Sequence, residues 1–136
     1  MSELGLARAQ QLIEQATAMA GSKFGKPICI SIVDATGLLI AFARQDGAPF
    51  RSIAISEGKA YSAARMTITT QAFYERLERE KIEASYFCDS KLTALPGGAP
   101  LKNVAGKIVG AAGVSGLTSA QDQEIVDALA EAVAKG

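Results

Sequence analysis

The sequence predicts a single α/β domain whose sheet is largely antiparallel. Three observations lead to this prediction: a helical stripe of apolar residues near the start, two short aliphatic runs separated by a turn, and a second helical stripe near the end. Helices on either side of a hairpin bury their apolar faces by packing on a sheet. At 136 residues the chain is long enough for one core, and neither a linker nor a repeat divides residues 1–136.

The first predicted element is an amphipathic helix that packs one face on the core and ends at Gly21. Its apolar stripe consists of Ala9, Leu12, Ile13, Ala16 and Ala20. The next two elements are predicted strands, "ICISIVD" (28–34) and "LLIAFAR" (38–44). Three turn residues between them predict a hairpin: Ala35, Thr36 and Gly37.

Alternation along the first strand of this hairpin predicts two different faces. One face carries Ile28, Ile30 and Ile32. The other face carries Cys29, Ser31 and Val33.

Two helices are predicted in the middle of the chain. The first spans residues 52–65, with Ser52 as its N-cap. The second runs from about residue 70 to residue 81 and buries Phe73 and Leu77, while its charged stretch "ERLEREK" faces solvent.

The last third of the chain predicts further strands and a closing helix. A short strand is expected near residues 91–95, and a turn at Ala105 and Gly106 leads into a strand over 107–115. Thr118 and Gln121 match a capping box at the start of the final helix. The apolar stripe of that helix consists of Ile125, Val126, Leu129 and Val133.

Composition excludes several classes of function. The 14 basic and 14 acidic residues balance, so nothing favours nucleic acid or an anionic membrane as a partner. No apolar run approaches the roughly 20 residues that cross a bilayer, and the acidic N-terminal segment is unlike a signal peptide. A cytoplasmic location is therefore expected, with Cys29 and Cys88 as free thiols because they lack CxxC spacing.

The sequence contains no histidine. This absence excludes Ser-His-Asp and Cys-His nucleophilic pairs, the HExxH zinc helix and haem ligation by a proximal histidine. No metal site is expected. Any chemistry in this protein must use other side chains and the backbone.

The segment "ALPGGAPL" (94–101) sets two glycines between two prolines. Pro96 and Gly97 are typical of a type II turn, and Gly98 allows the backbone to approach another group closely. Two interpretations remain open at this point. The segment is either a tight connection between strands or a nest of backbone N–H groups that receives an anion.

The segment "GKIVGAAGVSG" contains glycines at 106, 110, 113 and 116. Their spacing matches neither a dinucleotide fingerprint nor a nucleophile elbow. Small residues on one face of a strand allow a helix to pack closely. Alternatively, Ser115 and Gly116, just before the final helix, offer a hydroxyl and N–H donors to a carboxylate or phosphate.

The segment between the hairpin and the next helix contains several charged residues. Arg44, Asp46 and Gly47 lie in or beside a loop, and Lys59 lies close to the apolar stripe of the following helix. An inward-facing lysine binds an anion, or acts as a base if burial lowers its pKa. The simpler interpretations are a solvent-facing Lys59 and an Asp46 that only caps its own turn.

In combination, "SIVDATGLLIAFARQDGA", "GKAYSAA", "ALPGGAPL" and "GKIVGAAGVSGLTSAQDQEIVDALA" resemble the GlcG/HbpS family, which also includes the C-terminal domain of PduO-type adenosyltransferases. The resemblance extends from about residue 5 to residue 134. It implies a three-layer α/β domain with about five mainly antiparallel strands, and assembly into a homo-oligomer. It also implies that Pro96, Gly97, Gly98, the Asp46–Gly47 pair, Lys59, Ser115 and Gly116 surround one pocket.

Members of this family either bind haem or corrinoid or belong to pathways that break down small organic acids. The second context leads to our first interpretation: a binder of a small hydroxy, oxo or unsaturated carboxylate, without a cofactor. Arg44, Ser115 and the glycine amides would hold the carboxylate. Isomerase or lyase chemistry would use Lys59 or Asp46 as the base.

Two other interpretations remain open. One is a haem or corrinoid binder or sensor without catalysis. Because the chain has no histidine, the iron ligand would be Met66, Cys88, a tyrosine, a lysine or a threonine hydroxyl. The other is a purely structural accessory subunit.

Overall fold

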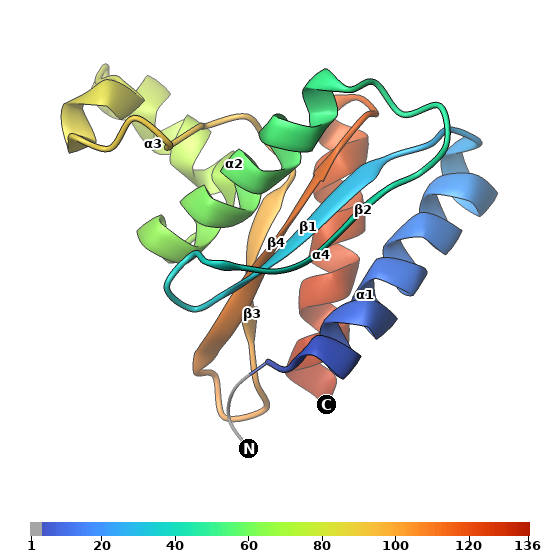
Figure 1. The fold of residues 1–136 in the computed structure, drawn as a ribbon. Helices are drawn as coiled ribbons and strands as arrows, with labels where there is room; N and C mark the ends of the chain where they lie inside the picture. Colours follow the sequence, from blue (N-terminus) through green and yellow to red (C-terminus); the bar gives the residue numbers. More distant parts are fainter. Residues whose placement is uncertain (1–3) are drawn as a thin grey trace.

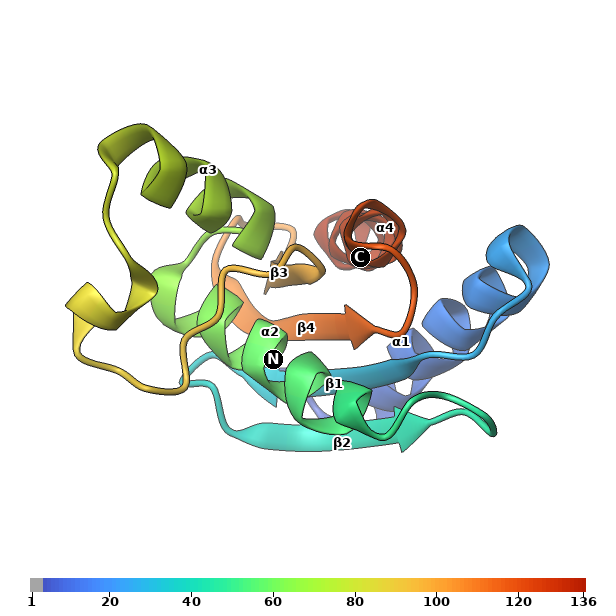
Figure 2. The ribbon, with the colours of Figure 1, turned by 90° about the horizontal axis from the view of Figure 1, so that it is seen from above.

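The computed structural model describes residues 4–136, which fold into four α-helices and a sheet of four antiparallel strands (Figure 1). In chain order the elements are α1 (Leu6–Met19), β1 (Cys29–Asp34), β2 (Leu39–Arg44), α2 (Arg51–Met66), α3 (Thr70–Glu80), β3 (Gly98–Lys102), β4 (Ile108–Ser115) and α4 (Ser119–Lys135). The strands are ordered β2-β1-β4-β3 across the sheet, as Figure 2 shows from above.

The domain has three layers, which confirms the predicted architecture. Helix α2 packs along β1, β3 and β4 on one face of the sheet, with α3 beside it, and α1 and α4 cover the opposite face (Figures 1 and 2). The larger core lies between the sheet and the α1/α4 layer, and a smaller core lies beneath α2. Strands β1 and β4 are therefore buried on both sides, whereas the edge strand β2 is only partly buried.

The hairpin and its two faces are also confirmed. Ile28, Ile30 and Ile32 are fully buried in the larger core. On the other face, Val33 packs in the smaller core beneath α2, and the Ser31 hydroxyl lies 2.8 Å from the Ser56 hydroxyl of α2.

Two predicted helix boundaries are wrong. The first helix does not end at Gly21, because one π-helical turn over Ala20–Phe24 continues it to Gly25, which has a φ of 64°. Ser52 is not an N-cap either. Phe50 occupies that position, and Ser52 lies buried in the first turn of α2.

The strand count is four rather than about five among residues 4–136, because residues 91–95 form no strand. Strand β3 begins instead inside the "ALPGGAPL" segment, at Gly98. Pro100 is tolerated there because β3 is an edge strand with a free side for a residue that lacks an N–H.

The final helix begins as predicted. The Thr118 hydroxyl accepts a hydrogen bond from the Gln121 amide at 3.2 Å, and the Gln121 side chain accepts one from the Thr118 amide at 3.3 Å. Within residues 4–136, no helix combines the length and the apolar character that a membrane-spanning helix needs.

Candidate ligand-binding site

Lys59, the predicted base, is buried and ion-paired. Its side chain extends from α2, and the ammonium donates to the Val114 carbonyl of β4 at 2.8 Å and to Asp122 Oδ2 of α4 at 3.0 Å. Only 2% of Lys59 and 2% of Asp122 is exposed. Lys59 therefore ties together the helices on opposite faces of the sheet, and the solvent-facing interpretation is wrong.

Burial shifts the pKa of both partners in this ion pair. Loss of hydration lowers the pKa of Lys59 and raises the pKa of Asp122, and the attraction between the two charges opposes both shifts. The Leu117 amide also donates to Asp122 Oδ1 at 3.1 Å. The carboxylate thus receives hydrogen bonds from two directions.

Gly97 and Gly98 lie against this ion pair. A Cβ on Gly97 would approach Lys59 Nζ and the Val114 carbonyl to 2.7 Å each, and Gly97 has a φ of 129°. The Gly97 amide donates to Gln123 Oε1 at 2.6 Å, and the Gly98 amide donates to Thr70 Oγ1 at 2.9 Å. Both N–H groups are therefore satisfied by side chains, which supports the close-approach interpretation of this segment over a free anion nest.

The segment 113–116 is packed in the same way. A Cβ on Gly113 would lie 2.1 Å from the Ser56 carbonyl, so this glycine lets α2 approach the sheet closely. Ser115 is 5% exposed, and its hydroxyl donates to the Ser52 hydroxyl at 3.1 Å. Gly116 has a φ of 131° and turns the chain beside Pro27.

The remaining predicted residues lie elsewhere. Arg44 and Asp46 line an open hollow of about 640 Å³ between the end of β2 and the end of the first helix, and Gly47 lies beside Pro27 at its margin. Lys59 is not among the residues that line this hollow. The structure therefore separates the predicted residues into a buried group around Lys59 and an open group around Arg44 and Asp46, and Pro96 is a half-buried neighbour of the first group.

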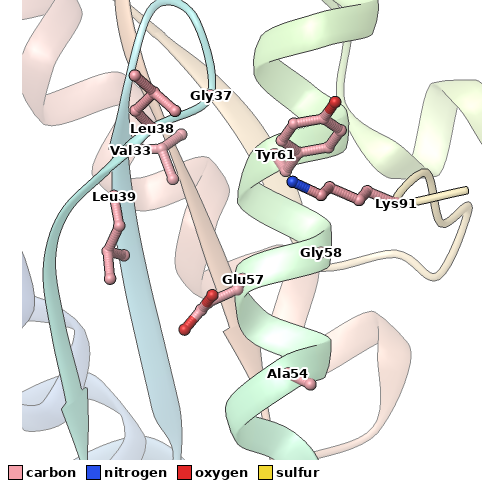
Figure 3. Close-up of a pocket in the computed structure, with 9 residues that line it drawn as sticks. All are labelled: Val33, Gly37, Leu38, Leu39, Ala54, Glu57, Gly58, Tyr61 and Lys91. Carbon is pink, nitrogen blue, oxygen red and sulfur yellow. The ribbon is translucent and has the colours of Figure 1, made fainter. Parts of the chain in front are cut away.

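A different cavity, of about 430 Å³, lies between the β1–β2 hairpin and α2 (Figure 3). Its lining consists of Val33, Gly37, Leu38, Leu39, Ala54, Glu57, Gly58, Tyr61 and Lys91. Aliphatic and aromatic side chains predominate, and Figure 3 shows the Lys91 amine pointing toward α2 and the hairpin. We call this the hairpin–helix cavity.

Sequence reasoning missed this cavity. A signal in the sequence was the pair Leu38 and Leu39, two adjacent leucines at the start of a predicted strand. In the structure both leucines line the cavity, and they are 67% and 51% exposed. The contribution of Lys91 could not be found, because it comes from a loop far along the chain.

Tyr61 forms one end of the hairpin–helix cavity, and both its ring and its hydroxyl make close contacts with neighbouring residues. Its ring packs against Gly37, where a Cβ would lie 3.0 Å from the ring. Its hydroxyl donates to Asp89 Oδ2 at 2.6 Å and accepts from Arg65 Nε at 3.0 Å. The hydrogen bond from Tyr61 is the main cause of the lowered pKa of Asp89.

The other side of Tyr61 borders an open hollow of about 490 Å³, which we call the sulfur hollow. Its lining consists of Tyr61, Arg65, Met66, Phe87, Cys88, Asp89 and Leu92. The structure thus gathers Met66, Cys88 and a tyrosine, three of the iron ligands considered above. Cys29 and Cys88 are both free thiols, and among residues 4–136 no three Cys, Asp or Glu side chains converge as a metal site would require.

Comparison with known proteins identifies the family of this chain. Residues 4–131 match the family model described as "Haem degrading protein HbpS-like". No curated protein sequence matches the chain directly.

Several solved structures are similar over nearly the whole chain. The Klebsiella pneumoniae protein ORFY is 26% identical, with 96% of this chain and 90% of that chain covered and a TM-score of 0.85. A double mutant of Streptomyces reticuli HbpS is 25% identical, with 98% and 88% covered and a TM-score of 0.84. The structure described as a PduOC:heme complex is 25% identical, with 96% and 95% covered and a TM-score of 0.84.

Proposed function

This chain belongs to the HbpS-like family, and we propose that it is a small-molecule-binding protein whose ligand is a small organic acid held in the hairpin–helix cavity. The observation that carries the proposal is the lining of that cavity. Pockets for small molecules are typically 300–1,000 Å³ in volume, mostly apolar, with a few placed polar groups. The cavity of about 430 Å³ has this character (Figure 3).

The charged side chains around the cavity support an amphipathic organic acid as the ligand. Lys91 supplies a cation that forms charge-assisted hydrogen bonds with a carboxylate. Glu57 supplies an acceptor from α2, which suits a hydroxyl group on the same ligand. Val33, Leu38 and Leu39 form the apolar wall for the body of the ligand.

A thermal-shift screen tests this proposal. Hydroxy, oxo and unsaturated carboxylic acids are compared with their amides, and we expect an acid to raise the melting temperature in proportion to its occupancy. Ala54→Phe fills the cavity and should abolish the shift, whereas Ala18→Phe, on the exposed face of α1, should preserve it. Equal shifts in the two variants would contradict the proposal.

Proton-transfer chemistry is the finer part of this proposal. Neither Lys59 nor Asp46 lines the hairpin–helix cavity, so this chemistry requires the substrate to reach one of them at a second position. There, Lys59 or Asp46 removes a proton from the carbon beside the carboxylate and returns it to a neighbouring position. The lowered pKa of Lys59 supports a base, while its burial and its bond to Asp122 require the segment around Gly97 to open for substrate. Exchange of substrate C–H for deuterium, followed by NMR, should disappear in Lys59→Met or in Asp46→Asn, measured under conditions in which circular dichroism shows that the variant is folded. Exchange that survives in both Lys59→Met and Asp46→Asn rules out these bases.

Haem is the second candidate ligand, and the sulfur hollow favours it. Phenol, thioether and thiolate groups all ligate haem iron in proteins, and Tyr61, Met66 and Cys88 border this one hollow. Arg65 would hold a propionate, and Phe87 and Leu92 would supply apolar contact. These residues fit the group, whose iron would supply ligand binding or electron transfer when bound. A similar structure is described as a heme complex.

Haemin titration separates the two candidates. If haem is the ligand, we expect a saturable Soret band that shifts or disappears in one of Tyr61→Phe, Met66→Leu or Cys88→Ser. A band that none of the three variants changes would count against this hollow as the haem site.

A further inference from the structure

The loop 88–93 is fastened to α2 at two points. Asp89 accepts a hydrogen bond from the Tyr61 hydroxyl at 2.6 Å, and its other oxygen accepts from the Lys91 amide at 3.1 Å. The Thr93 amide donates to the Ser62 hydroxyl at 2.8 Å. Both anchoring side chains, Tyr61 and Ser62, belong to α2, so the backbone of Lys91 is held between two attachments.

This attachment places Lys91 at the hairpin–helix cavity. A Cβ on Gly58 would lie 3.8 Å from the Lys91 carbonyl, so the loop backbone passes close to α2 at this glycine. The Lys91 ammonium lies 5.5 Å from the centroid of the Tyr61 ring, which is itself part of the cavity wall. Figure 3 shows the amine directed toward the space between α2 and the hairpin.

The charge of Lys91 is available to a ligand. Among the described residues, the ion pairs within 4.0 Å do not include Lys91. Both Lys91 and the nearby Arg65 lie over the Tyr61 ring, but the Arg65 guanidinium also donates a hydrogen bond to the Tyr61 hydroxyl. Lys91 is therefore the one cation that lines the hairpin–helix cavity.

From this arrangement we infer that Lys91 selects ligands with an anionic group, and that the hydrogen bond from Tyr61 to Asp89 is the device that positions it. The inference rests on the proposed function. It adds to that proposal a residue that discriminates an acid from its neutral analogue, and a second residue that acts only through the first. Tyr61 is thus a positioning residue as well as part of the cavity wall.

The first experiment compares 2-naphthoate with 2-naphthamide, which differ in charge but little in shape, by titration calorimetry. We expect the wild type to bind the acid about tenfold more tightly than the amide, because a charge-assisted hydrogen bond is stronger than a neutral one. Lys91→Met should lose this preference, because its affinity for the acid falls by more than its affinity for the amide. Lys91→Arg should restore much of it.

The second experiment tests the positioning role with Tyr61→Phe, which keeps the ring and removes the hydroxyl. We expect the preference for the acid to fall about threefold, and Asp89→Ala to act in the same way, whereas Asp89→Asn retains an acceptor and should act less. In the Lys91→Met background, Tyr61→Phe should have no further effect on the preference. A loss of acid and amide affinity in equal measure would show a structural role only and overturn this assignment.

The outcomes separate the two proposals. If neither naphthoate nor naphthamide binds and no acid in the thermal-shift screen stabilises the protein, the proposed function fails and this inference fails with it. If both bind equally well to the wild type and Ala54→Phe abolishes both, the cavity is a binding site and only the role of Lys91 is overturned.

Discussion

At the scale of single residues, the buried pair of Lys59 and Asp122 is the most consequential feature of this protein. Two charges taken out of water are stabilised only by each other and by close hydrogen bonds, which here come from the pair itself and from the Leu117 amide. The same lysine also bonds to a strand carbonyl. The lysine proposed as a base therefore also belongs to the framework that holds α2, β4 and α4 together.

Removing one partner should destabilise the fold strongly. Lys59→Met leaves the Asp122 carboxyl buried without its cation, which typically costs about 3–5 kcal/mol. Urea unfolding followed by circular dichroism measures this loss. The double variant Lys59→Met/Asp122→Leu removes both charges and should recover part of the stability; if it is no more stable than the single variant, the pairing is not the cause.

Gly97 should tolerate no side chain. In Gly97→Ala the Cβ meets the Val114 carbonyl at 2.7 Å and Asp122 Cβ at 2.9 Å, and a φ of 129° is strained for any other residue. We expect a loss of at least about 1–3 kcal/mol. Gly21→Ala is the matched control, because a Cβ there has nothing within 4 Å, and its unfolding midpoint should change little. Similar midpoints for the two variants would contradict this account.

At the scale of elements, the β1–β2 hairpin determines the shape of the hairpin–helix cavity. Asp34 closes its turn: one carboxylate oxygen accepts from the Thr36 amide at 2.9 Å, from the Thr36 hydroxyl at 2.6 Å and from the Leu38 amide at 3.0 Å. The hydroxyl bond is the largest cause of the lowered pKa of Asp34. The ionised form of this carboxyl therefore favours the folded turn.

Acid should loosen this turn. Because the folded-state pKa lies below the ordinary value of 3.8, Asp34 contributes stability above that value and loses it as pH falls through the lowered folded-state pKa. Stability is measured by urea unfolding over a pH series below 5. Asp34→Asn should show a shallower acid-side decline than the wild type, and identical slopes would contradict the assignment.

At the scale of the whole molecule, the sheet has two edges, β2 and β3. Edge β3 carries Pro100, which blunts strand pairing. Edge β2 begins with the exposed Leu39, next to the exposed Leu38. Exposed apolar groups beside an unprotected edge favour association with another chain.

The expectation of a homo-oligomer stays a prediction, and light scattering tests it. We expect a solution mass that is a multiple of the 14.1 kDa chain. Leu39→Lys should lower that mass if edge β2 takes part, because a charge on an edge strand opposes pairing. A wild type that is monomeric at all concentrations would contradict the expectation.

Periodicity and local chemistry were sufficient to predict most of the fold from the sequence. The stripe of α4, its capping box, the two faces of β1 and the hairpin depend on neighbours within a few residues, so the sequence alone determined them. The end of the first helix and the start of β3 depended on distant contacts. Gly97 and Gly98 are held by Gln123 and Thr70, whose positions no local pattern contains.

The candidate site divides in the same way. The sequence by itself determined that histidine chemistry is absent, and it marked Lys59 and the glycine-rich segments as unusual. Only the tertiary structure decided that Lys59 is ion-paired across the sheet and that Tyr61 and Lys91 meet at a separate cavity. The physical reason is that burial and charge pairing depend on which distant segments meet, and a loop 30 residues beyond Tyr61 in the sequence supplies the cation of that cavity.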